Sequence, residues 1–160
     1  MVHVLVLDVG TSSLKAMLYT GDGRLLNRAS QEYHSEFYAN SQVEQNPRTW
    51  YDAVYATLTQ SAAYITANSL HLDAIAVTSQ RASVIPIDAN GYTLHNAIMW
   101  QDKRSIAQAE QLLSQLSMKE MYHRTGLRAN PYFSVPKMMW LKDERREIYD
   151  KAHKLLGVQD

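Results

Sequence analysis

The sequence predicts an α/β protein whose mixed sheet opens with an antiparallel three-stranded meander and is flanked by helices. Two observations support this fold class. Three strand-like stretches occupy the first 33 residues and are separated by turns too short for any connection but a hairpin. A long stretch with helical spacing and further apolar strands then follow. The order is therefore a meander, a helix and more strands.

The first hairpin contains the most informative stretch of the chain. An apolar run at residues 4–7 predicts a strand that is buried on both faces, and it ends on the carboxylate of Asp8. A tight polar turn then leads into a second apolar run at residues 16–19. Gly10 in this turn lets backbone approach a ligand closely, and three hydroxyls beside it can donate hydrogen bonds to an anion. These hydroxyls belong to Thr11, Ser12 and Ser13.

A carboxylate, a glycine and hydroxyls together predict a loop that binds a phosphate carrying Mg²⁺. Asp8 can hold the hydrated ion, because Mg²⁺ keeps several waters and takes only one or two carboxylates from a protein. The alternative is a plain hairpin turn in which Asp8 and Ser12 only cap backbone groups. The loop is not of the Walker type, since it lacks a second glycine followed by Lys-Ser or Lys-Thr, and no helix pattern follows directly. A phosphate loop between two strands is typical of actin-like ATPases.

The composition is that of an ordinary globular protein. The 160 residues suffice for one domain with a core, and 46% of them are hydrophobic and 20% charged. Sixteen Lys and Arg balance sixteen Asp and Glu, which argues against a nucleic-acid partner. No apolar run is long enough for a bilayer span and no signal-peptide pattern opens the chain, so we expect a cytoplasmic protein without a membrane partner. The absence of cysteine excludes disulfides and thiolate metal sites.

The remaining elements of the first half follow from turn, cap and periodicity signals. After a glycine turn at 21–23, the pattern predicts a strand over 24–33, an irregular loop over 34–46, a helix from Asn46 and Pro47 to about Asn68, and strands over 72–78 and 82–87. Asn46 suits the N-cap and Pro47 the first helical position. Trp50, Tyr51 and Tyr55 are predicted to be core residues of this helix rather than a ligand platform.

This order of elements is that of the ribonuclease H-like, or actin-like ATPase, fold. In open α/β sheets, ligands bind outside the carboxyl ends of the strands. Asp8 and the pair Gln80-Arg81 both fall at such ends. The sequence therefore places both in the candidate site.

The second half of the chain is predicted to be mainly helical. After a polar cluster at 101–104, helices are expected over 103–116, from Ser117 to near Gly126, from Ser134, and as a charged turn over 143–151, before a last strand from Leu155. Ser117 and Glu120 fit a capping box. Asp160 stands where a further helix would be capped, so we interpret residues 1–160 as an incomplete amino-terminal domain of a longer protein.

Five segments resemble the FGGY carbohydrate kinases, in the same order and across essentially the whole chain. Residues 8–13 (DVGTSS) are similar to the amino-terminal phosphate motif of that family, and residues 43–50 (VEQNPRTW) to its acidic loop before the first long helix. Residues 78–81 (TSQR) and 96–104 (NAIMWQDKR) resemble substrate-side segments of glycerol kinase and its relatives. The last segment, made of residues 125–127 (TGL) and 130–134 (NPYFS) with Lys137, is similar to glycerol kinase as well. One such motif is weak evidence, but five in register are strong.

The resemblance implies an ATP-dependent sugar or polyol kinase that uses Mg²⁺. It implies that Gly10, Thr11, Ser12 and Ser13 face the ATP phosphates, that Lys15 stands where glycerol kinase has an arginine near the nucleotide, and that Asp8 helps to place Mg²⁺. It assigns the binding of the small-molecule sugar or polyol to Gln80, Arg81, Trp100, Asp102 and Tyr132. The alternatives are a surface salt bridge for Arg81, core packing for Trp100 and a loop anchor for Tyr132.

Three features limit what the resemblance assigns. Glycerol kinase-like proteins carry an acid after the Gln-Arg pair, where this chain has Ala82, which argues against glycerol as the substrate. Asp102 and Arg104 form a pattern closer to xylulose- and gluconate-type kinases, so a pentulose, a sugar acid or another polyol remains open. The catalytic Asp and the nucleotide domain of the family are expected beyond residue 160, so residues 1–160 alone are expected to be inactive.

The sequence leaves two alternative functions open. One is a non-catalytic sugar-binding sensor or scaffold of the same fold, which the presence of the phosphate loop and of Gln80-Arg81 disfavours. The other is an actin- or chaperone-like ATPase that acts on proteins. The polar cluster at 101–104 and the loop at 130–134 favour a small polar substrate instead. Whether the protein forms a homo-oligomer is left open.

Overall fold

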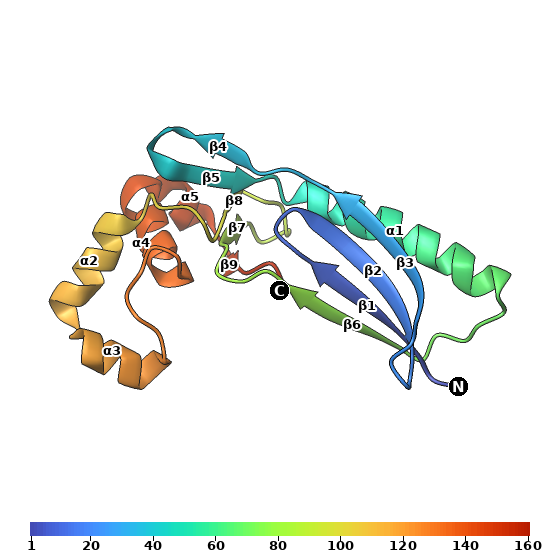
Figure 1. The fold of residues 1–160 in the computed structure, drawn as a ribbon. Helices are drawn as coiled ribbons and strands as arrows, with labels where there is room; N and C mark the ends of the chain where they lie inside the picture. Colours follow the sequence, from blue (N-terminus) through green and yellow to red (C-terminus); the bar gives the residue numbers. More distant parts are fainter. The chain divides into compact units, whose positions relative to one another are not determined.

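The computed structural model describes residues 1–160, and the chain divides into two compact units (Figure 1). The first unit contains Met1–Ser35, Asn46–Gln80 and Gln159, and the second contains Glu36–Gln45, Arg81–Val158 and Asp160. Each unit has its own β-structure and its own apolar core. None of the helices has both the length and the apolar character of a membrane-spanning segment.

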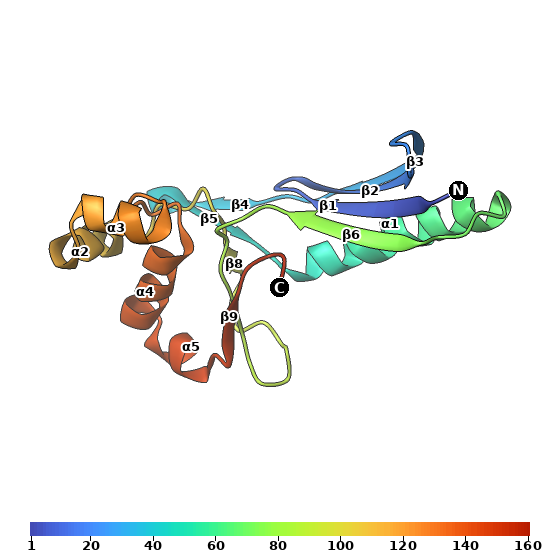
Figure 2. The same ribbon diagram turned by 90° about the horizontal axis from the view of Figure 1, so that it is seen from below.

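A four-stranded mixed sheet forms the centre of the first unit. It contains β1 (His3–Val9), β2 (Ser13–Thr20), β3 (Leu25–Glu32) and β6 (Ala74–Ser79), in the order β3-β2-β1-β6. β1 pairs antiparallel with β2 and β2 with β3, whereas β6 runs parallel to β1. The helix α1 (Arg48–Ala67) lies along one face of this sheet (Figure 2). An α/β structure with a mixed sheet is thus confirmed.

Only one face of this sheet is buried. Along β1 the side chains alternate, so that Leu5 and Leu7 join the core beneath α1 and are at most 7% exposed. Val6 and Asp8, on the other face, are partly exposed. The expectation of a strand buried on both faces was therefore wrong, because α1 supplies apolar side chains such as Ile65 to one face alone.

The helix α1 begins close to the expected position. The Asn46 side chain accepts a hydrogen bond from the backbone N–H of Arg48 at 3.0 Å, at the start of the helix. Trp50 is buried as expected, but Tyr51 and Tyr55 are 74% and 77% exposed, so their assignment to the core was wrong. The buried stripe of α1 consists of Trp50, Ala53, Thr57 and Ser61. This spacing of three and four residues leaves both tyrosines on the solvent side.

The strand β6 forms one edge of the sheet. It pairs with β1 on one side and with no strand on the other. Its apolar side chains Ile75 and Val77 are 54% and 51% exposed. The strand expected over 72–78 therefore exists, but its apolar side chains are not buried within this chain.

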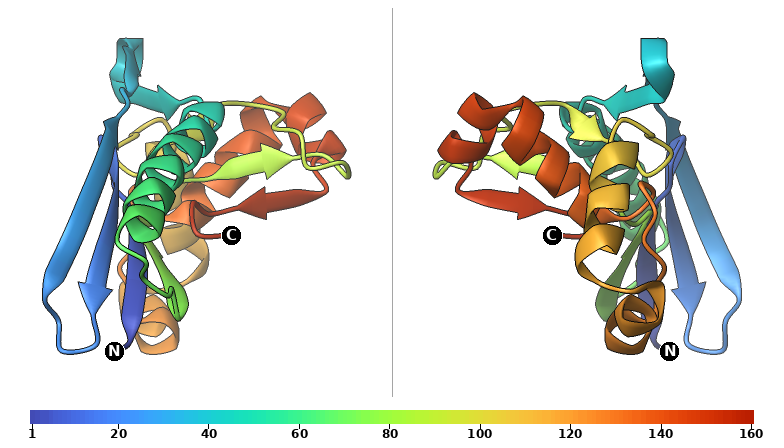
Figure 3. Two further views of the ribbon diagram at one scale, coloured as in Figure 1. Left: turned by 90° about the vertical axis from the view of Figure 1, so that its right-hand side faces the viewer. Right: turned by 90° about the vertical axis from the view of Figure 1, so that its left-hand side faces the viewer.

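The second unit combines two small sheets with four helices. β4 (Glu36–Tyr38), β5 (Gln42–Gln45) and β8 (Ala97–Ile98) form one sheet in that order, and β7 (Ile85–Ile87) pairs with β9 (Lys154–Leu156) in the other (Figure 3). A 3₁₀ turn, Ala39–Ser41, joins β4 to β5. The helices are α2 (Ile106–Gln115), α3 (Met118–Thr125), α4 (Ser134–Glu144) and α5 (Arg146–Lys151).

One expectation for the second unit was wrong and two were met in part. The irregular loop expected over 34–46 forms β4 and β5, because β5 finds its partner β8 far along the chain. The strand expected over 82–87 exists but is shorter, at Ile85–Ile87, and it pairs with β9. The expected capping box of α3 is met in part: the Ser117 hydroxyl accepts a hydrogen bond from the Glu120 N–H at 3.1 Å, but the Glu120 carboxylate accepts one from Arg124.

The core of the second unit ties β8 to α4. Val84, Ile98 and Leu141 have no exposed surface, and Trp140 and Leu155 pack against them. Val84 and Ile98 also exchange backbone hydrogen bonds of 2.9 and 3.0 Å. This core holds in place the two segments, after β8 and at the start of α4, that carry the polar residues described next.

Candidate functional site

The loop between β1 and β2 is closed by Gly10. Its N–H donates a hydrogen bond to the Ser13 carbonyl at 3.0 Å. A side chain at position 10 would place its Cβ 3.0 Å from the same carbonyl oxygen, which is closer than nearly all carbon–oxygen contacts of real side chains. The tight turn at this position therefore favours glycine on steric grounds alone.

Residues from two other segments of the first unit hold this loop. The Tyr33 hydroxyl donates to the Gly10 carbonyl at 2.7 Å, and the Tyr33 N–H donates to the Ser12 carbonyl at 3.1 Å. The Gln80 side-chain amide approaches the Gly10 carbonyl at 3.5 Å. Burial, and to a smaller extent the nearby Asp8 carboxylate, raise the pKa of the Tyr33 hydroxyl, which therefore stays a donor. The structure thus brings Gln80 to the loop.

The other residues assigned to the nucleotide lie on or beside the same loop. Ser12 is exposed, and Thr11 and Ser13 are partly exposed. Lys15 lies opposite Asp8 in the antiparallel pair of β1 and β2, so both side chains are on the sheet face away from α1. These residues are therefore gathered at the end of β1, as the sequence indicates.

The Asp8 carboxylate beside this loop fits a magnesium ion that binds together with a phosphate. No hydrogen bond or ion pair within the chain occupies the Asp8 carboxylate. The chain has no group of three or more His, Cys, Asp and Glu residues that could hold a metal ion by themselves. Mg²⁺ does not need such a group, because it keeps waters and takes other ligands from substrate phosphates. Asp8 is therefore suited to contact a hydrated ion.

The boundary between the two units falls directly after β6. Gln80 is assigned to the first unit and Arg81 to the second. Ala82 has a φ of +65°, a left-handed conformation that residues other than glycine rarely adopt. Arg81 is exposed and forms no hydrogen bond or ion pair within the chain, so the alternative of a surface salt bridge is not observed.

In the second unit, Trp100 and Tyr132 form part of the wall of a small pocket. Their ring centroids are 5.2 Å apart and their planes are inclined by 52°. The pocket has a volume of about 200 Å³ and is lined by Trp100, Gln101, Asp102, Lys103, Asn130, Pro131 and Tyr132. Trp100 is partly exposed and Tyr132 is 41% exposed, so both rings can meet a small molecule. Three of the residues assigned to the substrate thus come together.

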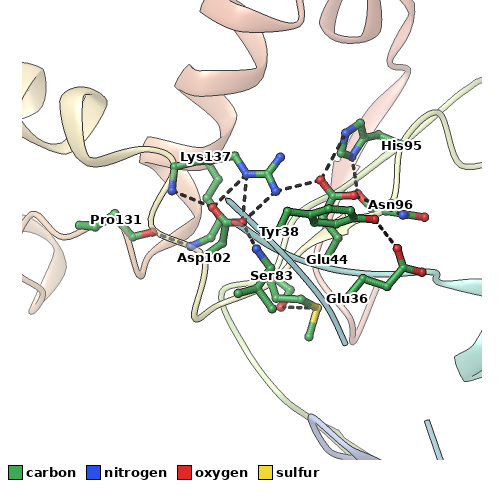
Figure 4. Close-up of polar contacts among 12 residues, drawn as sticks. Glu36, Tyr38, Glu44, Ser83, His95, Asn96, Asp102, Pro131 and Lys137 are labelled. Atoms are coloured by element: carbon green, nitrogen blue, oxygen red, sulfur yellow. Dashed lines mark hydrogen bonds and ion pairs between the residues drawn. The ribbon is translucent and has the colours of Figure 1, made fainter. Parts of the chain in front are cut away.

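The carboxylate of Asp102, in contrast, is directed into the protein. It is completely buried and accepts hydrogen bonds from the N–H groups of Val43 at 2.5 Å and Arg104 at 2.8 Å (Figure 4). The Arg104 guanidinium adds contacts of 2.8, 2.9 and 3.0 Å. Because its oxygens are occupied by the chain, this geometry does not support the direct substrate contact expected of Asp102.

Arg104, which the sequence marked only by its spacing from Asp102, is the centre of a buried ion network. Its Nη2 atom lies 2.8 Å from Glu44 Oε1, and the two side chains are 3% and 11% exposed. Its guanidinium also lies over the ring of Trp140, 4.8 Å from the centroid. Glu44 accepts a further hydrogen bond from Asn96 at 3.2 Å, and the His95 ring lies 3.7 Å away. The Asp-x-Arg spacing was the available signal, whereas Glu44 is 60 positions distant.

Lys137, in the first turn of α4, is a second buried cation. Its side chain has no exposed surface, and its ammonium donates to the carbonyls of Pro131 and Tyr132, both at 2.6 Å, and of Phe133 at 3.4 Å. Burial lowers the pKa of Lys137 to about 8, although the neighbouring Asp102 carboxylate opposes the shift. The sequence showed Lys137 only as part of a motif, without a role.

Comparison with known proteins agrees with these features. Residues 3–160 match the family described as "FGGY family of carbohydrate kinases, N-terminal domain". The chain is 33% identical over 162 residues to a glycerol kinase of Stenotrophomonas maltophilia (strain K279a), and 34% identical over 160 residues to a gluconokinase of Bacillus subtilis (strain 168). Each match covers 99% of this chain, and 32% and 30% of the relatives respectively.

A solved structure shows the same architecture. The Plasmodium falciparum glycerol kinase with ADP matches with a TM-score of 0.87 and 25% sequence identity, over 94% of this chain and 30% of that one. The chain thus spans about a third of the length of the curated relatives it matches. Because residues 3–160 match the N-terminal domain of this family, the chain belongs to the FGGY family of carbohydrate kinases.

Proposed function

We propose that the chain is the amino-terminal part of an ATP-dependent kinase that transfers the γ-phosphate of MgATP to a hydroxyl group of a sugar or polyol. The observation that carries this proposal is the glycine-closed loop between β1 and β2, with Asp8 and three hydroxyls beside it, in a chain of the carbohydrate kinase family. Because the chain spans about a third of its relatives, the activity is proposed for the intact protein.

The β1–β2 loop is proposed to hold the phosphates of the nucleotide. Its hydroxyls and backbone N–H groups are donors, and Lys15 adds a positive charge. Asp8 would help to hold the hydrated Mg²⁺ that accompanies these phosphates. When bound, Mg²⁺ neutralises charge on the phosphate groups. The contribution of Thr11, Ser12 and Ser13 is therefore to bind and orient the nucleotide.

Four residues are proposed to contact the acceptor. The Arg81 guanidinium offers five donors in a fixed fork, which suits hydroxyl or carboxylate oxygens, and Gln80 beside it adds an amide. The rings of Trp100 and Tyr132 offer apolar faces on which the C–H groups of a sugar can pack. Asp102 acts indirectly, by holding Arg104 and the segment that carries Trp100.

The acceptor is proposed to be a pentulose, a sugar acid or a polyol other than glycerol. Ala82 presents a methyl group where glycerol kinase-like proteins have an acid that binds glycerol hydroxyls. Sequence identity does not choose among the relatives, because the chain is 33% identical to a glycerol kinase and 34% identical to a gluconokinase. The choice therefore depends on the residues of the acceptor side.

The catalytic carboxylate is proposed to lie beyond residue 160, together with the domain that binds adenine. Phosphoryl transfer to a hydroxyl needs a carboxylate that orients the attacking oxygen. Asp102 is completely buried in an ion pair, and Asp8 belongs to the phosphate loop, so neither is assigned that role.

A substrate screen on the intact protein tests the proposal. ATP consumption is measured with glycerol, pentuloses, gluconate and other polyols, with and without Mg²⁺. We expect turnover that depends on Mg²⁺ and on one acceptor class, with little or none on glycerol. Saturable sugar binding without ATP consumption would instead support a non-catalytic sensor or scaffold, and ATP consumption that no sugar stimulates would support an ATPase of another kind.

A further inference from the structure

All the hydrogen bonds of the buried Lys137 ammonium go to one loop. Lysine is almost never fully buried unless it is paired, because an uncompensated charge in the interior is costly. Lys137 is completely buried, and its ammonium reaches three successive carbonyls, those of Pro131, Tyr132 and Phe133. An ammonium has three donors, so its hydrogen-bonding capacity is used entirely on one loop.

Hydrogen bonds to Asn130 hold the backbone N–H groups of the same loop. The Asn130 side chain accepts a hydrogen bond from the Tyr132 N–H at 2.9 Å, and the Asn130 carbonyl accepts one from the Phe133 N–H at 3.1 Å. The backbone of Tyr132 is therefore held at its N–H by Asn130 and at its carbonyl by Lys137. Its ring is 41% exposed, so packing alone does not determine where the ring lies.

The charges around Lys137 balance. Two carboxylates, Asp102 and Glu44, accompany two cations, Arg104 and Lys137, in the buried interior of this unit. Asp102 favours the charged form of Lys137, and Arg104 disfavours it. Removal of the lysine charge would leave a net negative cluster and carbonyls that have lost a donor.

We propose that Lys137 is a positioning residue for the acceptor, which holds the loop at 130–133 so that the Tyr132 ring stays against Trp100. It acts through Tyr132 and does not itself contact the acceptor, since it has no exposed surface. The inference rests on the proposed function to the extent that Tyr132 contacts the acceptor.

The kinetic test compares two substitutions in α4 of the intact kinase, Lys137→Met and Lys142→Met. Each removes one lysine charge, but Lys142 is exposed near the end of the helix. In Lys137→Met the KM for the acceptor should rise about tenfold or more, because the loop loses charge-assisted hydrogen bonds, while the KM for ATP should stay within about twofold. Lys142→Met should leave both constants unchanged.

Hydrogen exchange separates the loop from overall stability. In the wild-type protein the amides of Tyr132 and Phe133 should exchange slowly, and in Lys137→Met they should exchange about tenfold faster or more, with the rest of α4 unchanged. A lower melting temperature with an unchanged acceptor KM would make Lys137 a purely structural residue and overturn the inference.

Two further outcomes remain decisive. If Lys137→Met does not fold, fast exchange of Tyr132 and Phe133 in the wild type shows that the loop is not held and overturns the inference, whereas slow exchange supports it. If the wild type turns over no acceptor, the proposed function fails by itself. The exchange rates still test the inference in that case. Equal rates for the two amides in wild type and variant would show that Lys137 does not hold the loop, and faster exchange in the variant would show that it does.

Discussion

The carboxylate of Asp102 and the guanidinium of Arg104 form an ion pair with side chains only 0% and 3% exposed, although the residues are two positions apart in a polar stretch. Three contacts of 2.8–3.0 Å join them. Such a pair gives little net stability over apolar residues, but removal of one partner leaves an uncompensated buried charge. The pair therefore makes the second unit sensitive to loss of either charge.

Asp102→Asn tests this sensitivity. The substitution keeps the shape and removes the charge, so the free energy of unfolding should fall by about 3–5 kcal/mol, measured by urea unfolding. Asp150→Asn is the matched control, because Asp150 pairs with Arg146 at the surface, where the side chains are 53% and 63% exposed. The control should change stability by less than about 1 kcal/mol. Equal effects of both substitutions would contradict a buried network.

Gly10→Ala should damage nucleotide binding. The new Cβ would lie 3.0 Å from the Ser13 carbonyl oxygen, so this carbonyl must give by a few tenths of an ångström, which shifts the backbone that carries the loop hydroxyls. The dissociation constant for MgATP, measured by calorimetry on the intact protein, should rise about tenfold or more. Gly23→Ala is the control, since it affects the hairpin turn between β2 and β3 and should leave MgATP affinity unchanged. An unchanged affinity in Gly10→Ala would reduce the loop to a plain turn.

Arg81→Lys should damage sugar use more than ATP binding. Lysine keeps the charge but loses the planar fork, and one lost charge-assisted hydrogen bond costs about 1.5–3 kcal/mol. We expect roughly a ten- to hundredfold drop in kcat/KM for the acceptor in the intact kinase. The melting temperature should hardly change, because Arg81 is exposed and has no ion pair within the chain. Normal sugar kinetics with a lower melting temperature would refute the assignment to the substrate.

Ala82→Gly should stabilise the protein. Ala82 adopts a φ of +65°, which costs an L-residue roughly 1–2 kcal/mol, and glycine relieves this strain at the expense of a more flexible unfolded chain. The net gain should be about 0.5–1 kcal/mol by urea unfolding. Ala63→Gly, at an exposed position inside α1, should have the opposite sign and cost about 1 kcal/mol. Destabilisation at both positions would argue against a left-handed Ala82.

Lys137 should make the free energy of unfolding increase with pH in the alkaline range. Burial lowers its pKa to about 8 from the ordinary 10.5, so between these values the folded protein binds fewer protons than the unfolded chain. Stability rises with pH wherever the unfolded state binds more protons. The difference in unfolding free energy between wild type and Lys137→Met should therefore be flat below pH 8 and should shift in favour of the wild type up to about pH 10.5. A difference that stays constant across this window would contradict the lowered pKa.

Local signals in the sequence were sufficient for the features that depend on neighbouring residues. The turn at Gly10, the Asn46 side chain at the start of α1 and the Ser117 cap of α3 each involve hydrogen bonds across two or three positions. The same local motifs, in register, identified the carbohydrate kinase family, which the match over residues 3–160 confirms. Local geometry repeats wherever the same residues recur, so these features could be predicted without coordinates.

Only the tertiary structure decided which residues are buried and which charges meet. The strands β4 and β5 form because β5 pairs with β8 far along the chain, and Tyr51 and Tyr55 are exposed because the sheet covers another side of α1. Glu44 reaches Arg104 across 60 positions, and Lys137 is buried because three carbonyls and a balanced ion cluster surround it. A polar residue in the sequence shows no sign of such burial, because the cost of removing its charge from water is offset only by partners that folding brings together.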